Sequence, residues 1–143
     1  MRSAAVFVVL VGMVPVVGAL AACKPAAPTL DPAAAPMAQA FYDEVRRGAD
    51  LDADTHLAHE LKNPTTEAEI AEFRTLIPSD APAPPTLKSW DVKTDSTGTT
   101  TRLTQVYRYA DRVLVAQTAL FKSPSGVEPV IVGFKVQPSD GSD

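Results

Sequence analysis

The spacing of hydrophobic residues changes twice along this chain, and each change marks a different kind of structure. An uncharged, mostly apolar run extends from residue 3 to residue 23. Between residues 36 and 77 apolar residues recur every three or four positions, which is the period of an amphipathic helix, and from residue 86 onward they alternate with polar ones, which is the period of a strand. The pattern therefore predicts helices first and a sheet afterwards.

The clearest helix is predicted over residues 36–47. Met37, Phe41 and Val45 lie four residues apart and form one apolar stripe. Gly48 follows directly and is a natural C-terminal stop. This helix is expected to pack on another element through its apolar side.

Two weaker helical segments are predicted before the sheet. Residues 50–61 place Leu57 and Leu61 four positions apart after a run of aspartates that can cap a short helix. Thr66 with Glu69 three residues later fits a capping box. The helix that it opens ends before Pro78 and turns an apolar side toward the core, formed by Ile70, Phe73 and Ile77.

The alternating region predicts four strands joined by short turns, over residues 86–94, 99–109, 112–122 and 128–137. Helices followed by such strands are typical of an α+β domain. We therefore expect two or three N-terminal helices packed on a curved four-stranded antiparallel meander. This domain spans residues 36–138, and a frayed tail follows at 139–143.

The first residues of the chain have the layout of an export signal, with Arg2 ahead of an apolar stretch. The stretch ends in Leu20-Ala21-Ala22-Cys23, which resembles the lipobox of bacterial lipoprotein precursors. The resemblance implies removal of residues 1–22, a diacylglyceryl group on the Cys23 sulfur, and a domain anchored to a membrane of the cell envelope. The alternatives are an ordinary signal peptide that leaves Cys23 as a free thiol, and a retained membrane span.

Residues 23–35 form a Pro/Ala-rich segment that favours the extended polyproline II conformation. They are interpreted as a tether between the anchor and the domain. Lys24, rather than aspartate, follows the cysteine. In a bacterium with two membranes, the lipoprotein sorting pattern then implies the outer membrane, with the domain facing the periplasm.

Parts of the predicted sheet also resemble a known fold. Tyr107-Arg108-Tyr109, the hairpin turn at Ala110-Asp111 and the last apolar strand with Val132-Gly133-Phe134 are similar to pieces of the cystatin-like and nuclear-transport-factor-2-like domains found in bacterial lipoproteins. The resemblance implies a curved sheet wrapped on helices, sometimes with a cone-shaped pocket. It implies no fixed activity, because one such scaffold hosts enzymes, binders and assembly modules.

Two patterns, one of aspartates and one of histidines, partly match metal-binding motifs. Asp50, Asp52 and Asp54 have the spacing of the first calcium ligands of a loop, but the glycine and the bidentate glutamate of that loop are missing. His56 and His59 lie three apart, whereas zinc proteases need two histidines four apart. The prediction is therefore no metal and no cofactor.

In isomerases of the resembled fold, an aspartate base and a tyrosine donor face each other inside a dry pocket, which tunes their pKa values for proton transfer. The residues available for this on the predicted scaffold are Tyr42, Asp43, Asp91, Tyr107 and Tyr109, but their spacing does not place them together. Half-buried phenols more often bury the ring and leave the hydroxyl at the rim. No catalytic residue is predicted.

Composition narrows the partners further. The net charge is −4, or about −5 once Arg2 is removed, so the chain has no basic surface with which to bind nucleic acid. The main hypothesis is a non-catalytic, lipid-anchored protein that binds a partner protein or a small apolar ligand, with Tyr107, Tyr109 and Phe121 as a candidate binding surface on the sheet. The alternatives are a pocket enzyme of isomerase or hydrolase type, and a structural module that forms a homodimer.

Overall fold

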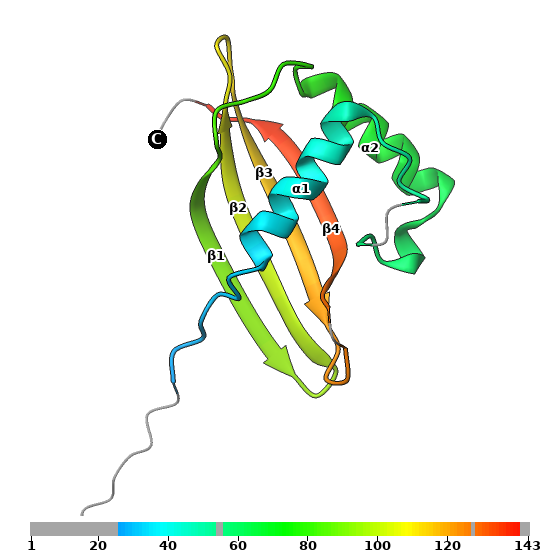
Figure 1. Cartoon of the computed structure of the whole chain (residues 1–143), viewed down its shortest axis with the longest axis vertical. Coiled ribbons are helices and arrows are strands. Elements are labelled where there is room, and N and C mark those ends of the chain that lie inside the picture. Colours follow the sequence, from blue (N-terminus) through cyan, green and yellow to red (C-terminus); the bar gives the residue numbers. More distant parts are fainter. Residues whose placement is uncertain (1–25, 54–55, 127, 141–143) are drawn as a thin grey trace, which may run out of the picture.

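A computed structural model describes residues 26–53, 56–126 and 128–140 of the chain (Figure 1). Two α-helices and a short 3-10 helix precede a four-stranded antiparallel sheet with the strand order β1-β2-β3-β4. The predicted class, an α+β domain with an antiparallel meander, is confirmed. The elements in chain order are α1 (Ala34–Arg47), η1 (His59–Leu61), α2 (Pro64–Leu76), β1 (Thr86–Asp95), β2 (Gly98–Arg108), β3 (Val113–Lys122) and β4 (Val130–Pro138).

Helix α1 is the amphipathic helix that the sequence predicts, although it begins at Ala34 rather than at residue 36. It ends where expected, because Gly48 adopts the left-handed conformation with φ 73° and donates its backbone N–H to the Val45 carbonyl. Its buried side includes Phe41 and Val45 and, in addition, Tyr42, which is completely buried. The apolar stripe is thus wider than the predicted four-residue spacing.

The helix predicted over residues 50–61 is largely wrong. Among the described residues of this segment only η1 is helical, and Leu57 instead forms a parallel bridge with Ile131 of β4. The Ala58 N–H donates to the Ile131 carbonyl at 2.9 Å, and the Ile131 N–H donates to the His56 carbonyl at 2.6 Å. Hydrogen bonds to the edge of the sheet therefore replace those of a helix, and Leu57 is buried as a strand residue would be.

Helix α2 begins three residues earlier than the capping box predicts, so the assignment of Thr66 as the cap is wrong. Asn63 caps the helix by accepting a hydrogen bond from the Thr66 backbone N–H at 3.0 Å, and Pro64 occupies the first turn. Proline suits this position because its missing N–H would have no partner there. Ile70 and Ile77 are buried as predicted, whereas Phe73 is only partly buried.

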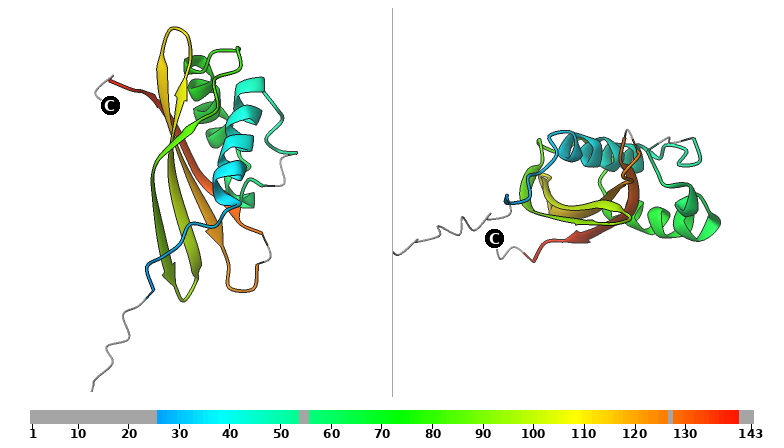
Figure 2. Two further views of the ribbon diagram at one scale, coloured as in Figure 1. Left: turned by 60° about the vertical axis from the view of Figure 1, so that its left-hand side comes forward. Right: turned by 90° about the horizontal axis from the view of Figure 1, so that it is seen from below.

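The four strands match the predicted ranges within a few residues, and their register assigns side chains to two faces. Leu103 on β2 lies opposite Trp90 on β1 and Thr118 on β3, on the face that carries the helices. Gly98 opens β2 with a φ of 149°, and a Cβ atom there would lie 2.4 Å from the Lys122 carbonyl oxygen, so the turn into β2 requires glycine. Figure 2 shows that the sheet curves around the helical layer.

The helices cover one face of the sheet unevenly. Helix α1 packs on β2 and β3, and α2 packs on β4 and on α1, while β1 lies beside the helical layer (Figure 1). The core lies between the helices and β2, β3 and β4, and its largest buried side chains include Phe41, Leu103, Leu114, Leu120 and Ile131. Strand β1 is exposed along nearly its whole length, and Leu87 and Trp90 are 38% and 41% exposed.

Candidate functional site

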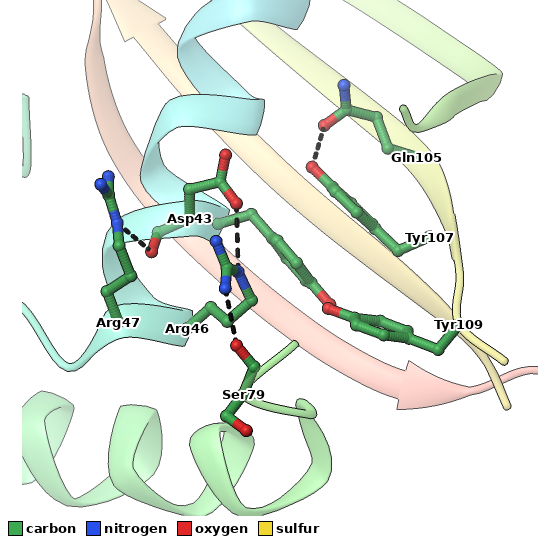
Figure 3. A network of polar contacts seen from close by, with 8 residues as sticks. Asp43, Arg46, Arg47, Ser79, Gln105, Tyr107 and Tyr109 are labelled. Carbon is green, nitrogen blue, oxygen red and sulfur yellow. Dashed lines mark hydrogen bonds and ion pairs between the residues drawn. The ribbon is translucent and has the colours of Figure 1, made fainter. Parts of the chain in front are cut away.

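The chain's three tyrosines form one cluster beneath α1 (Figure 3). The rings of Tyr42 on α1 and Tyr107 on β2 are stacked, with centroids 3.6 Å apart and planes 9° from parallel. The hydroxyl oxygens of Tyr42 and Tyr109 are 2.8 Å apart and share a hydrogen bond. Tyr107 donates to the Gln105 side-chain oxygen at 3.3 Å, and Gln105 in turn donates to the Ala35 carbonyl of α1 at 3.3 Å.

Charged groups flank this cluster without entering it. Arg46 donates to the Asp43 carboxylate at 3.3 Å and to the Ser79 carbonyl at 2.8 Å, and so links α1 to the segment after α2 (Figure 3). Burial raises the pKa of Tyr42, Tyr107 and Tyr109 above the usual value for a phenol. All three tyrosines are therefore neutral at physiological pH, and the cluster joins α1 to the sheet through hydrogen bonds between uncharged groups.

The tyrosines and acids considered for catalysis do not converge. Tyr42 and Tyr107 are 0% and 1% exposed with their rings in contact, so no substrate fits between them. Asp43 is bound by Arg46 at the rim of the cluster. Asp91 lies on β1, where it is opposite Arg102 on the face away from the helices, and its carboxylate is 3.6 Å from that guanidinium. No acid and tyrosine of this set meet in a pocket.

The predicted aromatic binding surface is also not formed. Tyr107 is buried under α1 and Tyr109 is half-buried on the same face. Phe121 on β3 lies opposite Thr100, next in sequence to the buried Leu120, and therefore points to the other face of the sheet. The three side chains cannot contact one ligand together, because the sheet separates Phe121 from the two tyrosines.

The residues weighed as metal ligands are spread over a loop. The Asp50 carboxylate accepts the Asp52 backbone N–H at 3.0 Å, which is a turn within the chain, and Asp54 lies outside the described residues. His56 precedes the bridge to β4 and His59 opens η1, so they do not share a helical face. The part of the chain that the structure describes contains no group of three or more histidine, cysteine, aspartate or glutamate residues placed to bind a metal ion.

The predicted lipidation site lies outside the described residues, since the description begins at residue 26. This applies to Cys23 and to the recognition residues Leu20, Ala21 and Ala22. Within residues 26–53, 56–126 and 128–140, no helix is long and apolar enough to cross a membrane.

An apolar crevice of about 190 Å³ opens between η1, α2 and β4. Its floor is aromatic: the Phe134 ring is 5.1 Å from Phe41 and 6.0 Å from Phe73, centroid to centroid, and both pairs meet edge to face. Val132, at a β-bulge of β4, is 37% exposed at the rim. The other lining residues are Leu57, Leu61, Thr66, Glu69, Ile70, Ile131 and Gly133.

Sequence reasoning did not identify this crevice. The one signal for it is Phe73, which was expected to face the core but is only partly buried, as is Leu61. The crevice lies where the chain after α1 pairs with the edge of β4 and the N-terminal half of α2 lies beside the same strand. Pairing of this kind between distant segments is not visible as a periodicity.

Two wider hollows lie along the opposite face of the sheet. They measure about 300 and 430 Å³ and share Thr104 and Gln117, which lie side by side on β2 and β3. Lys135 and Arg102 border one of them and Lys88 the other. Both hollows are more open than the crevice beside α2, and the second is mainly polar, whereas the first has a mainly apolar lining like that of the crevice.

Comparisons of this chain with protein-family models, with curated proteins and with solved structures find no match.

Proposed function

We propose that this protein is a non-catalytic bacterial lipoprotein, anchored through Cys23 in the cell envelope, whose domain binds a small apolar ligand in the crevice between α2 and β4. The observation that supports this most directly is the crevice itself. Partly exposed phenylalanines line it, and an exposed valine stands at its rim. Ligand sites in proteins are concave and mostly apolar, with a few polar groups at their mouths.

The size and rim of the crevice restrict the ligand. Its volume of about 190 Å³ is below the roughly 300–1,000 Å³ of most small-molecule sites, so it suits one ring or a short alkyl segment rather than a whole lipid. Glu69 is exposed on α2 at the same opening. A carboxylate there disfavours anionic ligands, so we expect the bound group to be uncharged or to carry a cationic head.

The anchor and the fold family are parts of the same proposal. The junction Leu20-Ala21-Ala22-Cys23 supports lipidation, and Lys24 supports the outer membrane as the destination in a two-membrane host. The helices packed on a curved four-stranded meander support a cystatin-like or nuclear-transport-factor-2-like relationship. Such a domain held by a tether can meet apolar ligands that leave or enter the bilayer.

The proposal is tested with N-phenyl-1-naphthylamine, an uncharged apolar probe whose fluorescence increases away from water and whose phenyl group is the single ring that the crevice can hold, with the naphthyl group at the rim. We expect saturable binding to the purified domain, weakened at least about tenfold by Val132→Asp, because a charge at the rim must lose water when the probe binds. Leu87→Asp is the matched control, since Leu87 is 38% exposed, compared with 37% for Val132, but lies on β1. Equal binding by the two variants, or no saturable binding by the wild type, would contradict the proposal.

A further inference from the structure

We infer that the free edge of β1 is a self-association surface, on which β1 of a second copy of this chain pairs antiparallel about Val92. Strand β1 pairs with β2 on one side and is the first strand of the sheet, so from Ser89 to Asp95 its other side presents backbone groups that pair with no other strand in the described part of the chain. Such an edge is a template for another strand. This inference concerns the domain alone and does not depend on the proposed ligand or anchor.

Two irregularities limit the length of β1 that can pair. A β-bulge between Leu87 and Ser89 interrupts the strand at one end, and the turn after Asp95 ends it at the other. The regular segment is therefore Ser89–Asp95. Its midpoint is Val92, so an antiparallel pair that uses the whole segment in both copies has its twofold axis at Val92.

The charges of this segment agree with that register. Residues directly opposite in antiparallel strands lie on the same face, and pairing about Val92 places Asp91 opposite Lys93 of the second copy, twice by symmetry. Pairing about Asp91 or about Lys93 would place two like charges opposite each other at the axis. Pairing about Thr94 also matches opposite charges but uses only the end of the strand.

An ion pair within the domain extends this row of charges. Asp91 already faces Arg102, with 3.6 Å between the carboxylate and the guanidinium, and both side chains are about two-thirds exposed, at 66% and 63%. In the inferred dimer, Asp91 would lie between Arg102 and Lys93 of the second copy. Charge therefore alternates across the junction of the two sheets.

The other face of the segment is apolar. Trp90 lies opposite Leu103 and Val92 opposite Thr101, so both point to the helical side of the sheet, and Trp90 is 41% exposed because α1 does not cover β1. Pairing about Val92 places each Trp90 opposite Thr94 of the second copy and diagonal to Val92 of the second copy. Pairing thus covers the largest exposed aromatic side chain of the described residues from both copies.

The opposite edge of the sheet and the segment before α1 are poorer candidates for the partner. The edge of β4 is partly occupied by the Leu57 bridge and by two hydrogen bonds of Ile131. Thr29 and Asp31 line a small hollow with Val92 beside β1. However, within the described part of the chain residues 26–30 make no hydrogen bond, so they do not satisfy the edge of β1.

A disulfide test addresses the register. In the full chain with Cys23→Ser, an introduced cysteine is the only thiol, because the sequence has one cysteine. Val92→Cys places the thiol at the twofold axis, where opposite Cβ atoms are about 5 Å apart. Thr94→Cys is the matched control on the same face, since it would lie opposite Trp90 rather than opposite itself. We expect mild oxidation to cross-link Val92→Cys at least about ten times faster, and equal rates or no cross-link in either variant would overturn the inference.

A charge-exchange test needs no cysteine. Asp91→Lys and Lys93→Asp each place like charges opposite in the dimer, so each variant alone should sediment as a monomer under conditions in which the wild type associates. Mixed together, the two variants place opposite charges across positions 91 and 93 and should form a heterodimer. The fluorescence emission of Trp90, the only tryptophan of the chain, should then move to shorter wavelength. A wild type that is monomeric at every concentration, or a mixture that stays monomeric, would contradict the inference.

Discussion

At the scale of single residues, the tyrosine cluster should lower the free energy of unfolding as the pH rises above about 10. Burial raises the pKa of Tyr42 in the folded state above its value of about 10 in the unfolded chain. Below that value the phenol is protonated in both states, so its contribution is fully present. Above it the unfolded state loses the proton first, and the free energy of unfolding falls as the pH rises, by up to about 1.4 kcal/mol per pH unit for this group.

We therefore expect the Tyr42→Phe variant to lose less stability than the wild type between pH 10 and pH 11, although it is less stable at pH 7. Urea unfolding at a series of pH values measures the difference. The absorbance of tyrosinate measures deprotonation of the cluster alone, because the cluster contains every tyrosine of the chain. The same pH slope in both proteins, or three tyrosines that titrate near pH 10 in the folded state, would show that burial does not hold these protons.

The positions of these residues could be predicted only in part. Leu103, Tyr107 and Tyr109 all have odd numbers, so alternation along an extended chain puts them on one face, as the structure does. Alternation could not show that Tyr42 stacks on Tyr107, because this contact joins segments far apart in the sequence. The face of Phe121 depends on the register between β2 and β3, which alternation within one strand does not determine.

At the scale of elements, the start of α2 offers a comparison between the sequence interpretation and the structure. Asn63→Ala removes the side chain that accepts the Thr66 N–H and should cost about 1 kcal/mol of stability. Thr66→Ala should cost much less, because the cap uses only the backbone of Thr66. Thermal unfolding of both variants is the measurement, and a larger loss for Thr66→Ala would restore the predicted capping box.

The other elements show where local patterns are sufficient. The strands of the meander could be predicted from local sequence. Each strand pairs with its neighbour in the chain, so the alternation within each strand and the short turns between strands are enough to locate them. Residues 50–61 were misassigned because the spacing of Leu57 and Leu61 suits a helix equally well. Pairing with the edge of β4, which lies more than sixty residues further along the chain, replaces the predicted helix.

At the scale of the whole molecule, the sequence was sufficient for the class and the order of the elements but not for the crevice or the free edge. Both features depend on how the layers are offset. Helices α1 and α2 cover β2, β3 and β4 and leave β1 exposed. The four charged residues of β1 are typical of an edge strand, but they do not show that the helices leave it uncovered. Trp90 would be expected in the core of a sheet that was fully covered, and its exposure is a consequence of this offset.

The location of the molecule in the cell is tested at its anchor. If Cys23 carries acyl chains, each buried CH₂ group contributes about 0.8 kcal/mol, and two or three long chains hold the protein on the bilayer essentially permanently. We expect Cys23→Ala to move the protein from the membrane fraction to the soluble fraction. Lys24→Asp is the matched control, since it keeps the cysteine and should stay in the membrane fraction, moving toward the inner membrane of a two-membrane host. Unchanged sedimentation of Cys23→Ala with membranes would contradict lipidation and leave a retained span as the better explanation of residues 3–23.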